Sequence, residues 1–315
     1  PKFSGRSACG KSFSIARPEN FGDYMADIER LVGRYHDPKP TSLRRVVMAP
    51  TTLLHSAPGA ELREMAKLAR SLGIRLHSHL SETVDYLDAA RARFDMTPVQ
   101  FCAEHDWLGE DVWFAHLVKL LPQEITMLGQ TRTGIAHCPQ SNGRLGSGIA
   151  DLLALEQAGV PVSLGVDGAA SNEAADMQSE AHAAWLLQRA RKGMLATPRY
   201  DGGTFEGGGD AASVEDVVRW GSAGGAQILG LQQSGTVQVG RLADIAIYRL
   251  DDPRYFGLHD MAIGPVACGG RASLKALMIN GRVIVENDVI PGLDLEAMRH
   301  EAMSAVRTLQ QRAAR

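Results

Sequence analysis

The chain has 315 residues and a formal net charge of -3, and 44% of its residues are hydrophobic, which is enough for one large domain with a smaller companion or for two ordinary domains. It contains no basic block of the kind that neutralises phosphates and no apolar stretch of the roughly 18 residues that a membrane span needs, so neither a nucleic acid nor a membrane is an expected partner. Four scattered cysteines without a CxxC pair argue against a disulfide framework or a thiolate zinc site and fit a reducing, cytoplasmic compartment.

The first eighty residues predict an irregular start followed by helix and strand in turn. Residues 1–20 are rich in Ser, Gly, Lys and Arg without periodicity and are expected to form a loop. A helix is expected from Tyr24 onward, because apolar residues then recur at helical spacing up to Tyr35. Residues 44–48 predict a strand, an amphipathic helix begins near Pro58, and a second strand covers residues 74–80.

Strands and helices continue to alternate up to residue 191. The expected helices cover residues 85–94, 97–105, 122–130, 149–158 and 176–191, and the expected strands cover residues 112–117, 134–139 and 161–168. These strands are almost continuously apolar, which is typical of a parallel sheet covered by helices.

The pattern changes after residue 200. Residues 200–209 are Gly-rich and predict a surface loop, and Ser213 is expected to cap a helix that runs through Leu229. Short strands are expected at residues 243–250, 274–279 and 282–286, with Asn280-Gly281 as a hairpin signal. A helix is expected at residues 293–314.

Titratable side chains stand at the ends of successive predicted strands. His79 and Glu82 stand at the end of the strand predicted at residues 74–80. At the ends of the next three predicted strands stand, in order, His116, His137 and Asp167. In a parallel α/β barrel such groups collect at one rim, because the βα loops meet there. An imidazole can hold a divalent metal ion and a carboxylate can take a proton from bound water, so the pattern indicates metal-assisted hydrolysis.

Two of the histidines have simpler explanations. His137 stands beside Cys138-Pro139 and could brace a tight turn. His77 shares a strand face with His79, but we expect a structural role for it rather than metal ligation.

Four stretches together resemble a known family. The chain is similar to the amidohydrolase superfamily, in particular to its purine and triazine deaminase branch, and most of all to 8-oxoguanine deaminases. The likeness covers the chain from about Pro18 to its end. The stretches that carry it are His79-Leu-Ser-Glu82-Thr83, Trp113-Phe-Ala-His116, His137-Cys-Pro-Gln-Ser141-Asn142-Gly-Arg-Leu-Gly146 and Leu164-Gly-Val-Asp167-Gly168-Ala-Ala-Ser171-Asn172.

The resemblance implies one divalent metal ion, zinc or alternatively iron, bound by His79 and Asp167. Asp167 would also accept a proton from the attacking water, Glu82 would carry a proton to a ring nitrogen of the substrate, and His116 would polarise or orient the water. The implied substrate contacts are His137, Ser141 and Asn142.

The resemblance also implies a fold and shows where this chain departs from it. The family fold is a TIM-type (β/α)8 barrel with a flanking β-sandwich, and its first strand carries an HxH pair. Here His77-Ser78-His79 belongs to the fifth strand, so strands four to eight are expected and the first three are not found. We therefore expect an irregular segment at residues 1–17, an incomplete barrel with the metal site at 18–232, part of a β-sandwich at 233–292 and a C-terminal helix at 293–315.

The implied function is metal-dependent hydrolytic deamination of a purine base, 8-oxoguanine or guanine, with release of ammonia. Two alternatives stay open: an aminohydrolase or chlorohydrolase of a triazine, and an inactive fragment that lacks the first-strand HxH ligands. The expected partner is a small heterocyclic substrate, and assembly into a homo-oligomer stays open.

Overall fold

The protein is described from a computed structural model, which covers residues 4–6, 12–14, 20–56, 59–195 and 211–314. The chain divides into two compact units, Pro1–Thr236 and Val237–Arg315. The loop expected at residues 200–209 lies outside the described residues. Among the helices that are described, none has the length and apolarity to cross a membrane.

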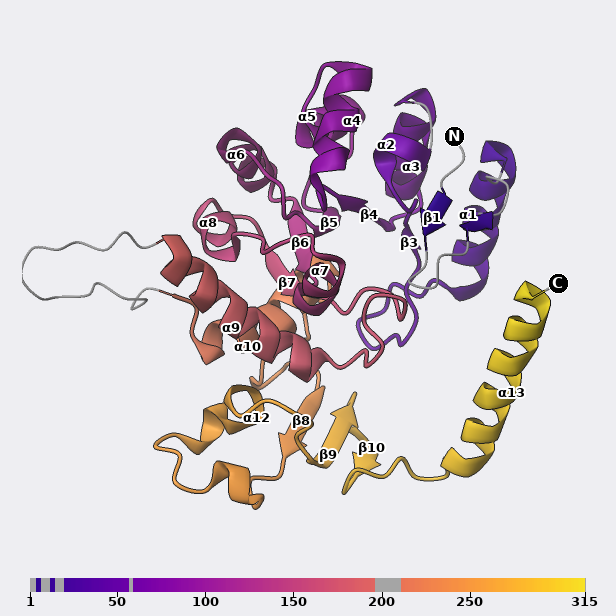
Figure 1. The fold of residues 1–315 in the computed structure, drawn as a ribbon. Coiled ribbons are helices and arrows are strands. Elements are labelled where there is room, and N and C mark those ends of the chain that lie inside the picture. Colours follow the sequence, from indigo (N-terminus) through magenta and orange to yellow (C-terminus); the bar gives the residue numbers. More distant parts are fainter. Residues whose placement is uncertain (1–3, 7–11, 15–19, 57–58, 196–210, 315) are drawn as a thin grey trace, which may run out of the picture. The chain divides into compact units, whose positions relative to one another are not determined.

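The first unit is built around a parallel sheet whose strands follow one another in chain order (Figure 1). This arrangement confirms the predicted alternation of parallel strands and helices. In the described part of the chain the sheet consists of β3 (Val47–Met48), β4 (Arg75–Leu80), β5 (Val112–His116), β6 (Gly134–His137) and β7 (Val162–Leu164).

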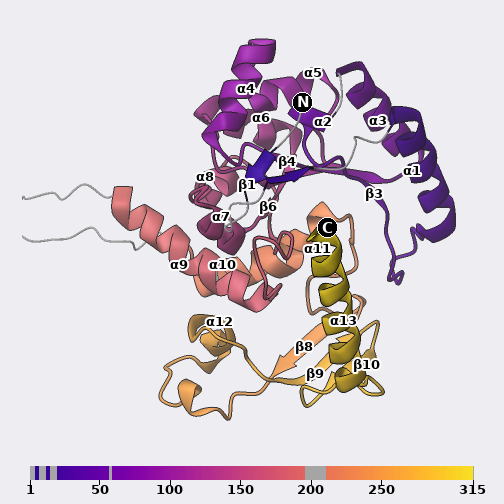
Figure 2. The same ribbon diagram turned by 45° about the vertical axis from the view of Figure 1, so that its right-hand side comes forward.

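The helices α3, α4, α5, α6 and α8 lie along the outer side of this sheet, whereas the short helix α7 lies near the ends of its strands (Figures 1 and 2). Their bounds agree with the predicted helices to within a few residues, apart from two short helices, α2 and α7, that the sequence did not predict. The helices are α1 (Phe21–Tyr35), α2 (Leu53–Ser56), α3 (Gly59–Ser71), α4 (Val84–Phe94), α5 (Pro98–Glu104), α6 (Pro122–Thr131), α7 (Pro139–Leu145), α8 (Leu152–Gln157) and α9 (Met177–Leu195).

The core of the first unit lies between the sheet and these helices. Along β4 the side chains alternate, so that Leu76 and Leu80 are buried while His77 and His79 share the other face. From the helix side, Leu62 of α3 and Trp107 are fully buried, and the Trp107 indole N–H donates to the Leu62 carbonyl at 2.9 Å. Burial of each such side chain stabilises the fold by about 1.5–3 kcal/mol.

Two predicted strands are shorter than expected. The strand predicted at 44–48 pairs only through Val47 and Met48, opposite β4. The strand predicted at 161–168 ends at Leu164, because after Gly165 the chain leaves the sheet and enters the turn that carries Asp167. The residues that follow β6 also differ from the prediction, since Pro139 begins α7 in a first-turn position instead of ending the strand.

The helix predicted from Ser213 to Leu229 is interrupted. Ser213 caps it as predicted, since its hydroxyl accepts from the Asp216 N–H. The helix consists of α10 (Val214–Arg219), a π-helical turn (Trp220–Gly224) and α11 (Gly225–Ile228). At Gly224 the helix lies against β7 so closely that an added Cβ would come within 1.9 Å of the Val162 carbonyl oxygen.

The N-terminal stretch differs from the loop predicted for residues 1–20. Its described residues form two short antiparallel strands, β1 (Ser4–Arg6) and β2 (Ser12–Ser14). A polar composition without periodicity suggested a loop, but it does not prevent the backbone from closing a hairpin.

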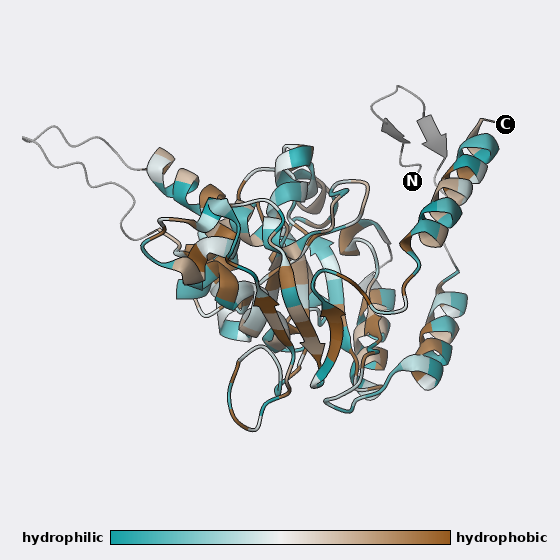
Figure 3. Ribbon diagram, turned by 90° about the horizontal axis from the view of Figure 1, so that it is seen from below, coloured by the Kyte–Doolittle hydropathy of each residue, from teal (hydrophilic) through white to brown (hydrophobic). Residues whose placement is uncertain are grey.

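The second unit holds an antiparallel sheet in the order β10-β9-β8, with β8 at Ile245–Tyr248, β9 at Leu274–Ile279 and β10 at Arg282–Glu286. Asn280 and Gly281 both have positive φ, as the predicted hairpin requires. The chain between β8 and β9 forms two 3-10 turns, Pro253–Tyr255 and Met261–Ile263, and α12 (Gly264–Ala267). The final helix, α13 (Leu295–Ala313), carries hydrophilic and hydrophobic residues along its length (Figure 3).

Candidate metal and catalytic site

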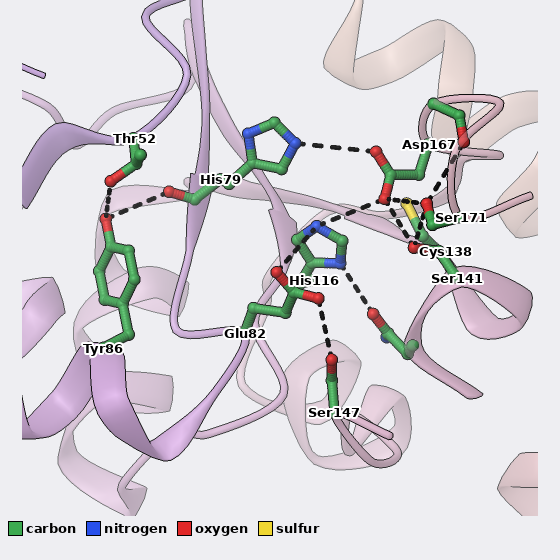
Figure 4. Close-up of polar contacts among 12 residues, drawn as sticks. Thr52, His79, Glu82, Tyr86, His116, Cys138, Ser141, Ser147, Asp167 and Ser171 are labelled. Atoms are coloured by element: carbon green, nitrogen blue, oxygen red, sulfur yellow. Dashed lines mark hydrogen bonds and ion pairs between the residues drawn. The ribbon is translucent and has the colours of Figure 1, made fainter. Parts of the chain in front are cut away.

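Successive strands of the parallel sheet deliver their polar side chains to one end of the sheet. His79 lies near the end of β4, His116 is the last residue of β5, and Asp167 follows β7. The pairing of β4 with β5 sets Leu80 opposite His116, so His79 and His116 leave neighbouring strands at the same level. Figure 4 shows the side chains of His79, His116, Asp167 and Glu82 facing one another.

The backbone turns abruptly where these side chains leave the sheet. His116 has φ 74° and Asp167 has φ 61°, both in the left-handed region that residues other than glycine rarely occupy. Ser81, just before Glu82, has φ 50°. Each such residue costs on the order of 1 kcal/mol or more, and such strain concentrates at functional sites.

The side chains approach without direct contact. The Nε2 atom of His79 lies 3.8 Å from one oxygen of Asp167, and the Nε2 atom of His116 lies 3.9 Å from the other. Glu82 points an oxygen toward the same His116 nitrogen at 3.8 Å. The two imidazole rings are stacked, with their centroids 5.3 Å apart.

Hydrogen bonds behind the rings fix which nitrogen of each histidine faces the cluster. The Nδ1 atom of His79 lies 2.6 Å from the Thr51 carbonyl oxygen, and the Nδ1 atom of His116 lies 2.8 Å from Oδ1 of Asn142. Both partners can only accept, so each Nδ1 carries the proton. In a neutral ring the nitrogen that faces Asp167 is then the Nε2 atom with a free lone pair, which is what metal ligation requires.

Two hydroxyl groups hold Asp167. Ser141 donates to its Oδ2 atom at 2.6 Å and Ser171 donates to the same atom at 2.9 Å. Burial acts to raise the pKa of the Asp167 carboxyl, but the hydrogen bonds from Ser141, the Gly168 N–H and Ser171, with the nearby His116, outweigh it and hold that pKa below its ordinary value. Asp167 is therefore a carboxylate at neutral pH.

Glu82 is held from its other side. The Ser147 hydroxyl, which is almost fully buried, donates to Oε1 of Glu82 at 2.9 Å. The second oxygen, Oε2, is the one that faces His116. The Glu82 side chain keeps 23% of its surface exposed, so it can reach a molecule bound over the cluster.

The residues expected to contact a substrate are all fully buried in this structure. Ser141 and Asn142 join the cluster through Asp167 and His116. His137 is placed at the end of β6, and its ring nitrogens have no hydrogen-bond partner among the described residues. Burial lowers the pKa of His137 to about 3, so its ring is neutral. A substrate contact by any of the three stays a prediction.

His77 lies beside the cluster, on the same strand face as His79. Its ring stacks on Trp113 with centroids 4.9 Å apart, and its Nδ1–H donates to the Trp113 carbonyl at 3.2 Å. Burial lowers the pKa of His77 to about 4. This placement fits the structural role that we expected for it.

Three residues that hold the cluster have no role in the sequence analysis. Ser171 stands four residues after Asp167, but nothing in the sequence pattern assigns its hydroxyl to that carboxylate. Ser147 lies 65 residues from Glu82 along the chain, so only the fold brings them together. Thr51 contributes a backbone carbonyl, which no side-chain pattern can indicate.

The donor atoms fit a divalent metal ion. Among the described residues, one ligand atom from each of His79, His116 and Asp167 lies within 4.8 Å of the other two. Ligands bound in a tetrahedron at about 2.0–2.1 Å from zinc lie roughly 3.3–3.4 Å apart, so the separations of 3.8 and 3.9 Å would have to shorten by about half an ångström around an ion. His116 thus joins the two predicted ligands as a third donor.

A family model described as the amidohydrolase family matches residues 4–284. The chain belongs to the amidohydrolase family. The match confirms the family that the four sequence stretches predicted.

Two curated relatives are deaminases. The chain is 62% identical over 293 residues to an isoxanthopterin deaminase from an unknown prokaryotic organism, covering 93% of this chain and 61% of that protein. It is 36% identical over 283 residues to the 8-oxoguanine deaminase of Pseudomonas aeruginosa, covering 89% of this chain and 59% of that protein. The chain therefore spans about three fifths of the length of these relatives.

Solved structures with the same fold support the barrel. An amidohydrolase from an environmental sample of the Sargasso Sea has a TM-score of 0.80 and 52% identity, covering 96% of this chain and 63% of that one. The atrazine chlorohydrolase of Arthrobacter aurescens TC1, solved with zinc, has a TM-score of 0.81 and 29% identity, covering 91% and 60%. The parallel sheet of this chain is therefore part of an amidohydrolase-type (β/α) barrel, as predicted.

Proposed function

We propose that this chain forms part of a metal-dependent hydrolytic deaminase of a bicyclic heterocyclic base. The observation that carries the proposal is the convergence of His79 Nε2, His116 Nε2 and the Asp167 carboxylate at the carboxyl ends of the parallel strands. The likeness to two deaminases supports this reaction among those of the amidohydrolase family.

A divalent ion held by these donors, zinc first and iron as the alternative, would lower the pKa of a bound water to about 7. The side chains supply the remaining chemistry. Asp167 is kept ionised by Ser141 and Ser171, so it can accept the proton of the attacking water. His116 faces Asp167 and Glu82 through a lone pair on Nε2, so it can orient that water or complete the ligand set.

Glu82 is the second acid–base group in the proposal. Its Oε2 atom points into the site while Ser147 holds Oε1, so a proton can pass from Glu82 to the ring nitrogen next to the reacting carbon. Water addition at the carbon that carries the exocyclic amine, followed by protonation and loss of that amine, gives the oxo compound and ammonia.

The substrate follows from what the two relatives' substrates share. Isoxanthopterin and 8-oxoguanine both contain a 2-amino-4-oxopyrimidine ring fused to a second ring that carries an oxo group. We place isoxanthopterin first, because the identity to its deaminase is 62% against 36% for the 8-oxoguanine enzyme. A purine base, 8-oxoguanine or guanine, is the second candidate substrate.

Ammonia release tests the proposal. The gene product that contains this chain is purified, loaded with zinc and incubated with isoxanthopterin, 8-oxoguanine, guanine or an aminotriazine. We expect ammonia and the matching oxo compound from at least one bicyclic base, with isoxanthopterin turned over fastest. Turnover of the triazine alone would support the triazine alternative. Zinc content well under one equivalent, with no ammonia from any compound, would refute the proposal.

A further inference from the structure

Glu180 is a buried acidic side chain outside the cluster of donors. It lies in the first turn of α9, its residue is fully buried, and none of its contacts is with His79, His116 or Asp167. A buried carboxylate is costly unless donors surround it. The residues that donate hydrogen bonds to this carboxylate, Gln140 and Asn172, therefore indicate its role.

Those partners belong to two separate βα loops, the one after β6, whose residues form the short helix α7, and the one after β7. The Gln140 backbone N–H, in the first turn of α7, donates to Oε2 of Glu180 at 3.2 Å. The Asn172 side-chain amide donates to Oε1. α9 packs against α7 in the fold, so the carboxylate joins the start of α7 to the turn that follows β7.

Each of these loops carries residues that hold the donors of the site. Directly after Gln140 stand Ser141, which donates to Asp167, and Asn142, which orients His116. Directly before Asn172 stands Ser171, which also donates to Asp167. The turn itself is closed by bonds from the Ser171 and Asn172 N–H groups to the Gly168 carbonyl, at 3.0 and 3.1 Å.

We propose that Glu180 is a positioning residue that holds these two loops at the separation at which Asp167 faces His79 and His116. A carboxylate suits the place because both partners are donors and each of its oxygens can only accept. An amide there would turn its NH2 group toward one of the two donors. The role in turnover rests on the proposed function, whereas the bracing of the two loops does not.

A matched control lies on the same helix. Gln188 is as well buried as Glu180, accepts from the Leu152 N–H at 3.2 Å and donates to the Ala150 carbonyl at 2.9 Å. It thus braces the connection between α7 and α8, which carries Ser147 but none of the groups that hold Asp167 or His116. Replacing either side chain by alanine removes a buried brace from α9, but only Glu180→Ala removes the one that joins the segments holding Asp167 and His116.

The first experiment compares Glu180→Ala with Gln188→Ala at pH 8. Amide hydrogen exchange is followed in peptides that cover residues 139–147, 150–153 and 167–173, and zinc affinity is measured by competition with a chromophoric chelator. We expect Glu180→Ala to speed exchange in the first and third segments and to weaken zinc binding about 10- to 100-fold. Gln188→Ala should speed exchange only in the second. Equal effects of the two variants on zinc affinity, or unchanged exchange in Glu180→Ala, would overturn the proposal.

A second experiment reverses one hydrogen bond. Glu180→Gln should weaken zinc binding because it loses one of its two bonds, and Asn172→Asp should do so because two acceptors then face each other. In the double variant the new amide can donate to the new carboxylate and still accept from the Gln140 N–H. We expect zinc affinity to return to within about threefold of the parent protein, from a loss of about tenfold or more. A double variant no better than either single one would overturn the proposal.

The two proposals fail in different ways. If the deaminase assignment is wrong, the unsubstituted protein releases no ammonia from any base, yet the exchange difference between the Glu180 and Gln188 variants remains. If the brace is wrong, the unsubstituted protein is active and Glu180→Ala leaves both loop segments protected.

Discussion

Replacing Glu180 by glutamine should change how the stability of the protein depends on pH. Burial raises the pKa of the Glu180 carboxyl from an ordinary value of 4.5 to about 7, even though the Gln140 N–H and the Asn172 amide act to lower it. Between these two pH values the folded protein holds a proton that the unfolded chain has released. The stability contributed by this group is therefore complete below about pH 4.5 and is lost as pH rises through about 7.

The size of the effect follows from the same two values. A proton held over a span of about 2.5 pH units corresponds to about 3 kcal/mol of unfolding free energy. Glu180→Gln has no proton to lose, so this decline disappears. At pH 5 the variant and its parent should differ by less than about 1 kcal/mol, because a protonated carboxyl group, like an amide, accepts through one oxygen only. At pH 8 the variant should be more stable by about 2–3 kcal/mol.

Urea unfolding at pH 5, 6, 7 and 8 measures the difference, with a chelator present so that metal binding does not contribute. All four tryptophans lie in the first unit together with Glu180, so their fluorescence reports its unfolding. His77 and His137, with pKa values lowered by burial to about 4 and 3, add a stability that is lost as pH falls below about 6.5. The parent protein and the Glu180→Gln variant share this histidine contribution, so it cancels in the difference between their unfolding free energies. Stabilities that fall in parallel between pH 5 and 8 would refute the reasoning.

Three further predictions concern packing and the proposed acid–base groups. Gly224→Ala should destabilise the protein by about 3 kcal/mol or more in urea unfolding, because the new Cβ would lie 1.9 Å from a carbonyl oxygen of β7, whereas Gly225→Ala, with nothing within 4 Å, should stay within about 1 kcal/mol of the parent. Glu82→Gln should keep its zinc and lose ammonia release about 100-fold or more, whereas Asp167→Asn should lose both; equal zinc loss would contradict the assigned roles. Ser147→Ala should slow ammonia release about tenfold with unchanged zinc content, since it removes one hydrogen bond to the Glu82 carboxylate; unchanged turnover would remove Ser147 from its role.

The strands and helices of the first unit could be predicted because their signals are local. Apolar periodicity and capping residues such as Ser213 act over a few residues, and the structure has these elements close to where they were predicted. Strand ends depend on more distant contacts. The apolar run of β7 continues to Val166, but the strand stops at Leu164, because the following residues enter the turn that is closed on the Gly168 carbonyl. No pattern within the strand itself indicates that contact.

The candidate site shows the same division. His79, His116 and Asp167 could be predicted because parallel strands bring their carboxyl ends together, whatever the details of packing. The groups that hold these three side chains in place could not be predicted. The Thr51 carbonyl that orients His79 comes from the loop after β3, and backbone atoms leave no trace in residue identity. Asn142 could be picked out as polar and near the site, but only coordinates show that its Oδ1 atom accepts from His116.

The Glu180 carboxylate is expected to have opposite effects on the stability of the fold and on zinc binding. An ionised carboxylate at this place costs folding free energy at pH 8, because burial outweighs the hydrogen bonds that it accepts from Gln140 and Asn172. Selection for stability alone would favour glutamine. The carboxylate is the better residue only if holding Gln140 and Asn172 together matters more than the energy it costs, and the loops they belong to carry the groups that hold Asp167 and His116. Glu180→Gln should therefore give a protein that is more stable at pH 8 and binds zinc more weakly, a combination that a purely structural role would not produce.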